Sequence, residues 1–266
     1  MKPKNFYRKT QDRVSFAREV LDAFWDEIAE AKRILIKPNI VSHEGYPTTT
    51  HPDLLDVILE ALEGLDVSVG DGVAIDVIGA RKALQRHPLK AICDRRGVRL
   101  LDFHHGRSGP FKSPRGYILN MTKVPLSYDY VISLPVLKAH GVCGITGALK
   151  NQFGYLTKAE RLKMHSHFKN IHQGIAEINV LMPPNLFLVD AVETLIGTNE
   201  VRHGGKKGNL GYMLAGKDPV LLDSFGVKIL GTVDDNLWGK DPIDILHIRY
   251  AQQFGLGDPA GDIREV

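Results

Sequence analysis

Two lysines and a histidine lie in one glycine-rich segment, and their types and spacing could do chemistry. The run LPVLKAHGVCGITGALKNQFGYL carries Lys138, His140 and Lys150. Gly144 and Gly147 lie between the histidine and the second lysine. Glycines at this density permit close approach of the backbone to a ligand and expose amide donors, which suits phosphate or carboxylate. The segment therefore predicts an anion site in which the lysines hold the ligand and the histidine moves a proton, so these three side chains are the candidate catalytic residues.

The same segment also has a purely structural interpretation. It matches neither the GxGxxG dinucleotide motif nor the GxxxxGK[ST] phosphate loop. The alternative to a ligand site is a tight glycine-rich connection whose lysines are solvated. We favour the ligand site because so many reactive residue types occur together.

Histidines are frequent in the second half of the chain. Five of the eleven lie between residues 140 and 203, and imidazole suits both acid–base chemistry and metal binding. The two cysteines, Cys93 and Cys143, form no CxxC, so any metal would need histidine or carboxylate ligands. We predict that His140, together with His165 or His167, supplies ligands or acid–base groups. The alternative for each is an ordinary surface or core histidine.

Short apolar, β-branched runs alternate with helical patterns along the chain. Such alternation is typical of a mostly parallel sheet that is covered by helices on both faces. We therefore predict an α/β fold with a Rossmann-like sheet and a cleft at the carboxyl ends of its strands. The predicted strands cover residues 33–38, 67–72, 98–103, 130–135, 186–191 and 212–216.

Capping patterns predict where several helices begin. Residues 13–32 have apolar side chains near helical spacing, and Thr50 before an early proline predicts an N-cap. Asp218 opens a later helix in the same way. The segment 107–125, with three prolines and two glycines, predicts an insertion or a β-hairpin.

A second capping box, at 157–160, opens a helix that runs toward the downstream histidines. On a continuous helix His165 and His172 share a face, and His167 points about 200° away. A chelate formed by His165 and His167 would then need locally non-helical backbone. At most one or two of the three can face the same site.

Nearly every predicted strand ends in polar residues or glycine. The carboxyl ends of parallel strands form the usual ligand site of such sheets, although turns also favour polar residues. Thr49 and His51 lie at a predicted helix N-terminus, where free amides and the helix dipole favour an anion. The residues that we predict to bind a cofactor or anion are Lys37, Asn39, Thr49, His51, Asp71, Gly144, Thr146, Gly147, Asn151 and Asp190.

Composition excludes several classes of protein. The 34 basic and 31 acidic residues are interleaved and give a net charge of only +3, which does not indicate nucleic-acid binding. The longest apolar runs, such as 130–137, fall far short of the roughly 20 residues that span a bilayer, and the N-terminus lacks the apolar stretch of a secretory signal. We predict a cytoplasmic chain that forms a single α/β domain over residues 1–266, with two lobes, 1–137 and 138–266, as the alternative.

Ordered motifs over most of the chain resemble the domain-of-unknown-function 362 family. They are IKPNIV, TTHPDLLDVILEAL, VGDG, LPVLKAHGVCGITGALKNQFGYL, the Arg-x-x-x-His pattern at 161–165, LFLVDAVE and LAGKDPVLLDSFGVKILG. Many members of that family carry an added ferredoxin-like cysteine module, which this sequence lacks. The resemblance therefore implies no intrinsic iron–sulfur cluster and a separate ferredoxin as a candidate partner.

One segment is also similar to the central motif of the nickel-pincer lactate racemase family. The run HGVCGITGALKNQFG begins at His140, and a histidine follows 15 or 17 positions after Lys150. The similarity implies that Lys150 holds the pincer nucleotide and that His140 is the catalytic base. It implies His165 or His167 as the metal ligand.

The residues and the resemblances together predict an enzyme that binds a small anionic ligand or cofactor. The cofactor candidates are a divalent metal and a nickel-pincer-like nucleotide, and the reaction would be proton transfer or redox chemistry at a carbon bearing oxygen. Such an enzyme would be isomerase- or racemase-like, or oxidoreductase-like. The alternatives are a non-catalytic module that docks a ferredoxin or delivers a cofactor, and a metal-free enzyme acting on a phosphate ester or nucleotide sugar.

Overall fold

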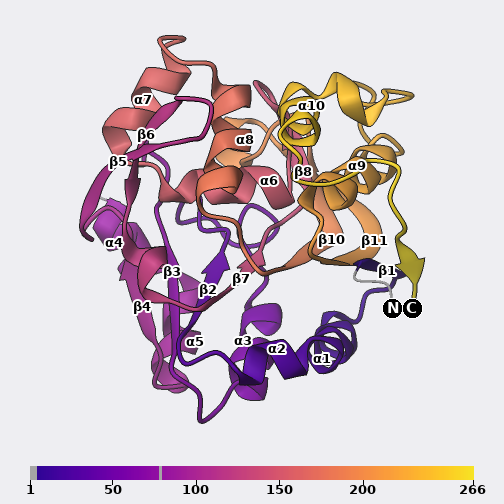
Figure 1. The fold of residues 1–266 in the computed structure, drawn as a ribbon. Helices are drawn as coiled ribbons and strands as arrows, with labels where there is room; N and C mark the ends of the chain where they lie inside the picture. The colour runs from indigo at the N-terminus through magenta and orange to yellow at the C-terminus, as the bar shows by residue number, and fades with distance from the viewer. Residues whose placement is uncertain (1–4, 78–79) are drawn as a thin grey trace.

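An eight-stranded sheet forms the centre of the computed structural model, which describes residues 5–77 and 80–266 (Figure 1). Its strands are β1 (Asn5–Lys9), β2 (Ile34–Pro38), β3 (Val67–Asp71), β4 (Arg99–Asp102), β7 (Tyr130–Leu134), β10 (Leu186–Ile196), β11 (Lys206–Gly216) and β12 (Arg264–Glu265). They are arranged in the order β12-β1-β11-β10-β7-β2-β3-β4. From β10 to β4 neighbouring strands are parallel, whereas β11 is antiparallel to both β10 and β1. The prediction of a mostly parallel α/β sheet is confirmed.

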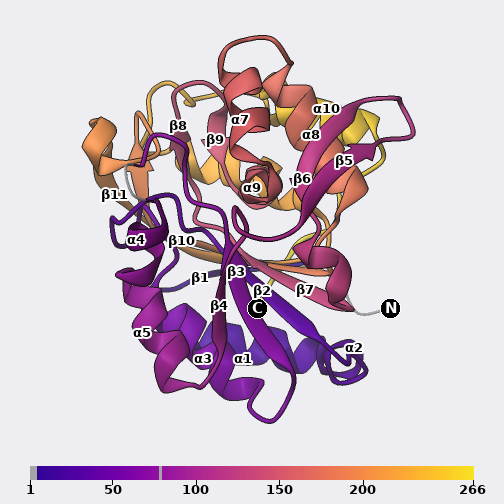
Figure 2. The same ribbon diagram turned by 90° about the vertical axis from the view of Figure 1, so that its left-hand side faces the viewer.

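Helices cover both faces of this sheet (Figures 1 and 2). One face carries α1 (Arg13–Ala23), α2 (Trp25–Ala29), α3 (Pro52–Ala61) and α5 (Pro88–Arg95). The opposite face carries α6 (Ala148–Asn151), α7 (Lys158–His165), α8 (Ile171–Leu181), α9 (Pro219–Leu230) and α10 (Leu246–Gln253). The short helix α4 (Ala80–Gln85) precedes α5.

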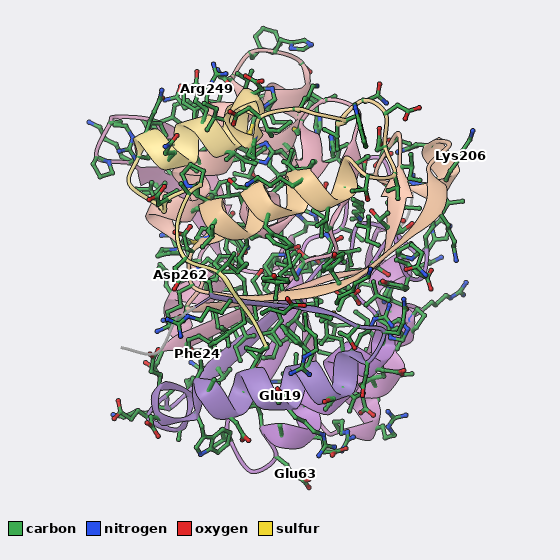
Figure 3. All side chains as sticks on the ribbon, turned by 90° about the vertical axis from the view of Figure 1, so that its right-hand side faces the viewer. Glu19, Phe24, Glu63, Lys206, Arg249 and Asp262 are labelled. Atoms are coloured by element: carbon green, nitrogen blue, oxygen red, sulfur yellow. The ribbon has the colours of Figure 1, made fainter. Side chains whose placement is uncertain are left out.

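The strand β2 shows how the sequence builds two cores. Successive side chains of a strand point to opposite faces, so Ile34 and Ile36 pack among α1, α3 and α5, while Leu35 packs on the side of α8 and α9. All three are completely buried. Side chains fill the space between the sheet and its helices on both sides (Figure 3). A strand that is buried on both faces is mostly apolar, and this made the central strands predictable from the sequence.

Two small hairpins and several 3₁₀ turns complete the described chain. The segment predicted as an insertion or hairpin forms β5 (Ser108–Lys112) and β6 (Ile118–Thr122), which pair antiparallel. The glycine-rich segment begins with a second antiparallel pair, β8 (Lys138–His140) and β9 (Gly144–Thr146). The 3₁₀ turns are η1 (Val124–Ser127), η2 (Gln152–Tyr155), η3 (Val201–His203) and η4 (Pro242–Asp244).

The predicted N-cap of α3 was wrong by one residue. The cap is His51, whose Nδ1 accepts the backbone N–H of Asp53 at 3.1 Å. The Thr50 hydroxyl accepts the amide of Asn39 and donates to the carbonyl of Leu134. Thr50 is thus used to join two strand ends instead of starting the helix.

The chain does not continue as one helix through the downstream histidines, so the condition under which His165 and His172 would share a face is not met. Helix α7 ends at His165, and α8 begins only at Ile171. His167 lies between them with a φ of 61°, in the left-handed region. The helical angles expected among these histidines therefore do not apply.

The later strands extend the first sheet. β10 and β11 are each eleven residues long, about twice the predicted length, and β10 pairs directly with β7. The strand β1 was not predicted. Within residues 5–77 and 80–266, no helix is both long enough and apolar enough to cross a membrane.

Candidate functional site

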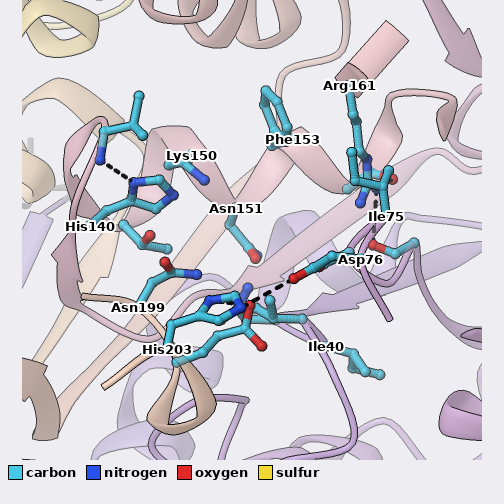
Figure 4. A pocket seen from close by; sticks show the side chains of 18 of the residues that line it. Ile40, Ile75, Asp76, His140, Lys150, Asn151, Phe153, Arg161, Asn199 and His203 are labelled. Carbon is cyan, nitrogen blue, oxygen red and sulfur yellow. Dashed lines mark hydrogen bonds and ion pairs between the residues drawn. The ribbon is translucent and has the colours of Figure 1, made fainter. Parts of the chain in front are cut away.

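A cavity of about 470 Å³ lies at the carboxyl ends of the central strands (Figure 4). Asn39 follows β2, Asp71 ends β3 and Glu200 follows β10, and all three line the cavity. The segment from Lys150 to His165 contributes another part of the wall. Because the carboxyl ends of parallel strands meet at one edge, the topology brings these distant segments together.

Lys150 contributes its amine to the cavity wall. Among residues 5–77 and 80–266, nothing forms a hydrogen bond or ion pair with its Nζ. This nitrogen lies over the ring of Phe153, 5.0 Å from the ring centroid, in a cation–π contact. Burial lowers the pKa of this amine, and the charge of Arg161 lowers it further. A lysine that lines a cavity without a counter-ion is suited to hold an anion.

The helix that carries Lys150 is anchored from behind. The buried carboxylate of Asp223 accepts the backbone N–H groups of Ala148 and Leu149, at 2.6 and 3.0 Å, in the first turn of α6. A Cβ atom at Gly147 would lie 2.2 Å from Asp223 Oδ1. Glycine is therefore needed here so that α6 can approach α9, and not for contact with a ligand.

His140 is held in one tautomer. Its Nδ1 accepts the backbone amides of Val142 and Cys143, at 3.2 and 3.1 Å. Burial, then the charge of Lys150, lowers its pKa well below 6.5, so the ring is neutral and carries its proton on Nε2. Figure 4 shows that this second nitrogen and the Lys150 amine point toward the same part of the cavity.

Arg161 joins the loops around the cavity. Its guanidinium is buried and donates to the carbonyl oxygens of Gly72, Val73, Gly154 and Leu156. Burial lowers its pKa to about 10. Because it contacts no carboxylate among the described residues, its charge adds to the positive potential of the cavity wall.

A buried ion pair lies at the base of the cavity. The Lys37 amine donates to Asp71 Oδ1 at 2.7 Å. Asp71 also accepts the amides of Ile40 and Gly72, each at 2.7 Å. This pair fixes the turns after β2 and β3, from which other cavity residues project.

Lys138 supports the neighbouring loop. Its amine is fully buried and donates to Asn39 Oδ1 at 2.9 Å and to the carbonyl of Thr48. It does not line the cavity. Lys138 therefore positions Asn39, and the geometry gives it no direct contact with a ligand.

The pKa of Lys138 predicts a pH dependence of stability. Burial lowers this pKa from 10.5 to about 7, so between these values the unfolded chain binds a proton that the folded chain does not. The free energy of unfolding should therefore rise with pH across this window, and the cost of burying the charge should be complete below pH 7. The free energy of unfolding of the wild type, relative to that of Lys138→Met, should increase by about 1–2 kcal/mol between about pH 7 and pH 9. Urea denaturation measures it. A constant difference would contradict the buried, titrating amine.

Asp76, Glu200 and His203 form a cluster at the mouth of the cavity, with ligand atoms within 4.8 Å of one another. The guanidinium of Arg202 already occupies this cluster, because it contacts Glu200 at 2.7 Å and Asp76 at 2.8 Å. His203 lies 3.2 Å from Asp76. A cation there would have to displace the arginine.

The two histidines predicted as metal ligands have different positions. His165 lines the cavity, and its ring packs edge-on against Phe153 at 5.8 Å. Burial and the charge of Lys150 lower its pKa. His167 is exposed and lies outside the cavity, because the chain leaves the helix immediately after His165.

The structure brings about half of the predicted site residues together. Those that line the cavity are Asn39, Asp71, His140, Thr146, Lys150, Asn151 and His165. Those that do not are Lys37, Thr49, His51, Lys138, Gly144, Gly147, His167 and Asp190. Lys37 and Lys138 nevertheless bond directly to Asp71 and Asn39 in the wall.

The residues outside the cavity satisfy other buried groups. The Thr49 hydroxyl donates to the carbonyl of Glu44. Asp190 accepts Arg13 at 2.7 Å and the Tyr46 hydroxyl at 2.8 Å, in the middle of β10. Gly144 has a φ of 79°, and a Cβ there would lie 2.7 Å from Ile245.

The sequence reasoning missed the loop that follows β10. Residues 198–200 and His203 line the cavity, but the predicted strand ended at 191, which placed its carboxyl end five residues too early. The apolar residues that continue to Ile196 were the available signal. Arg161 belonged to a recognised motif but was not predicted as a site residue.

Comparison with known proteins identifies a family and a fold. A family model described as Domain of unknown function (DUF362) matches residues 34–228. A search of curated protein sequences finds no significant match.

A search of solved structures gives matches that include the following two. The lactate racemase apoprotein from Thermoanaerobacterium thermosaccharolyticum has a TM-score of 0.53 and 15% identity, over 80% of this chain and 54% of that chain. A crystal structure of a protein from Thermotoga maritima has a TM-score of 0.44 and 11% identity, over 68% of this chain and 50% of that chain. The chain thus spans about half the length of these structures, and the first of them shows a shared fold.

Proposed function

The chain belongs to the Domain of unknown function (DUF362) family, and we propose that it is an enzyme that binds a small organic anion in the cavity of Lys150. The reaction is proton transfer or redox chemistry at a carbon bearing oxygen. A 2-hydroxy acid combines a carboxylate with such a carbon. The protein of similar fold is named as a lactate racemase, which agrees with this ligand class.

The observation that carries the proposal is that, among residues 5–77 and 80–266, nothing forms a hydrogen bond or ion pair with the Lys150 amine. Charges that are withdrawn from water are normally paired in proteins. No carboxylate of the described chain forms an ion pair with this partly buried lysine, and only the more distant charge of Glu200 on the same cavity wall acts on it. An anionic ligand would supply the missing charge and raise the lowered pKa of the amine again. The guanidinium of Arg161 adds positive potential to the same wall.

His140 would donate a hydrogen bond to the oxygen of the substrate. Its Nδ1 already accepts two backbone amides, so the free nitrogen bears the proton. A neutral imidazole in this state polarises a carbonyl or alkoxide oxygen. To act as a base, the ring would have to move its proton to Nδ1 and lose both amide bonds.

The cavity also fits a nucleotide cofactor that is attached through lysine. The Lys150 amine has no partner among the described residues, and its lowered pKa favours the neutral, nucleophilic form. His165 offers an imidazole on the same wall. Such a group, when bound, would supply a metal centre beside the oxygen-bearing carbon. Lys150 would hold the group, His165 would bind its metal, and His140 would contact the substrate oxygen.

Native mass spectrometry and calorimetry of the purified full-length chain test this function. We expect binding of lactate or inorganic phosphate, or a covalent mass increase that maps to Lys150. Retained binding after His140→Gln together with Lys150→Met would contradict the assignment. A chain that binds no anion and co-purifies with a ferredoxin would support the docking role in its place.

A further inference from the structure

The turn between α7 and α8 exposes a large aromatic side chain. Phe168 is 83% exposed and follows His167, whose φ of 61° is unfavourable for a residue other than glycine. The backbone N–H of Lys169 donates to the carbonyl of Lys163 at 3.2 Å and closes the turn. The turn projects beyond the neighbouring elements (Figures 1 and 2). The chain thus accepts a local strain and holds an apolar ring in water, which points to a role for the ring outside the fold.

Lysines surround this turn. The Lys169 amine donates to the carbonyl of Ile118 at 2.6 Å, so strand β6 of the small hairpin lies beside the turn. Lys112 is directly opposite Ile118 in the pairing of β5 with β6, and both side chains are exposed on the outer face of the hairpin. We call Lys112, Ile118, Lys163, Phe168 and Lys169 the tip patch.

The two segments that form the tip patch are strongly basic. Residues 107–123 and 157–170 hold eight basic residues and a single acidic one, whereas the whole chain has 34 and 31. The acidic residue, Glu160, is completely buried and pairs with Lys169. The rest of the chain therefore carries a net negative charge, and the excess of positive charge is concentrated around the tip patch.

An apolar tip among lysines fits the surface of an anionic membrane. Lys112 and Lys163 are exposed, and in the described parts of the chain, 5–77 and 80–266, their amines form no ion pair. A bilayer surface accepts a protruding aromatic ring without a matching pocket, and its negative potential attracts each lysine.

Two other classes of partner fit the tip patch less well. Protein–protein interfaces are enriched in arginine and depleted in lysine, whereas all three cations of the patch are lysines. Sites for single-stranded nucleic acid combine a groove with several aromatic side chains. The patch instead presents one aromatic ring on a projecting turn.

We propose that the tip patch docks the protein on a membrane surface that contains anionic phospholipids. Phe168 inserts among the headgroups, and the three lysines lie beside the phosphates. One apolar side chain alone would bind only weakly, so the positive charge is the second signal that docking needs. The patch shares no residue with the anion cavity, and the inference is therefore independent of the proposed function.

Sedimentation of the full-length chain with lipid vesicles tests the docking. We expect binding to vesicles made of equal parts of phosphatidylserine and phosphatidylcholine, and at least about 10-fold weaker binding to phosphatidylcholine alone. Salt should weaken the binding, because the Debye length falls from about 10 Å to about 3 Å between about 0.1 M and 1 M. Phe168→Ser should lower the affinity at least about 10-fold, and Lys112→Gln combined with Lys163→Gln should lower it about 20-fold. All three residues are exposed, so the variants should fold, which circular dichroism verifies.

The matched control is Lys9→Gln combined with Lys32→Gln, which removes the same charge. Both lysines are exposed and lie outside the two basic segments, and Lys32 follows α2 on the opposite face of the sheet. This variant should bind the anionic vesicles nearly as the wild type does.

Three outcomes would overturn the proposal. The first is equal binding of the wild type to the two kinds of vesicle. The second is an equal loss of affinity in the control and in the variant of Lys112 and Lys163. The third is binding to a thymidine oligonucleotide that depends on Phe168, without binding to anionic vesicles, which would assign the patch to nucleic acid.

Discussion

Replacement of Lys150 by methionine should weaken anion binding by at least about 100-fold, because it removes the charge while keeping the length of the side chain. The amine makes no hydrogen bond or ion pair within residues 5–77 and 80–266, so its loss should change the free energy of unfolding by no more than about 1 kcal/mol. The stem can still pack on Phe153. Isothermal titration calorimetry with lactate and inorganic phosphate measures the first effect, and urea denaturation measures the second.

The matched control for this experiment is Lys163→Met. Lys163 lies on α7, is exposed and does not line the cavity, so its replacement changes the net charge equally without touching the site. Equal losses of affinity in both variants would mean that the anion responds only to overall charge. Unchanged affinity in Lys150→Met would remove the basis of the proposed function.

Replacement of Asp71 by alanine should lower the free energy of unfolding by about 3–5 kcal/mol, since it leaves a buried charge uncompensated. The Lys37 amine is fully buried and bonds to Asp71 at 2.7 Å. The amides of Ile40 and Gly72 would lose their acceptor as well. Guanidinium denaturation followed by circular dichroism gives the size of the effect.

Two further variants show whether the ion pair is the cause. Asp53→Ala removes an exposed carboxylate from the first turn of α3 and should cost no more than about 1 kcal/mol. Lys37→Met combined with Asp71→Ala should recover part of the loss, because the uncompensated charge is then gone. If Asp71→Ala destabilised the chain no more than Asp53→Ala, the pair would contribute nothing to stability.

The central fold could be predicted because its strands are buried on both faces. Runs such as 130–135 are then mostly apolar, and this signal depends only on local composition. The strand β1 was missed because its residues are only partly buried. It lies near the edge of the sheet, between β11 and the two-residue strand β12. The end of β10 was missed because Asp190 looked like a terminal polar residue, whereas tertiary contacts with Arg13 and Tyr46 satisfy it inside the strand.

The site could be predicted only where one segment carries it. Lys150 and His140 lie in a single motif, and both line the cavity. The roles of Asp223 and Glu200 could not be predicted from neighbouring residues in the sequence. Asp223 accepts an amide of α6, and Glu200 lines the same cavity as Lys150, and in both cases more than forty residues separate the two positions. Glycine density was misleading in part, because Gly147 accommodates Asp223 and not a ligand.

The four carbonyl contacts of Arg161 imply a kinetic property of the cavity. One side chain holds the turn after β3 and the turn after α6, so neither turn can open alone without leaving a buried guanidinium unsatisfied. Hydrogen exchange of the amides in both turns should then follow one shared opening event. The rim would be ordered before a ligand arrives, and little conformational entropy would be lost on binding.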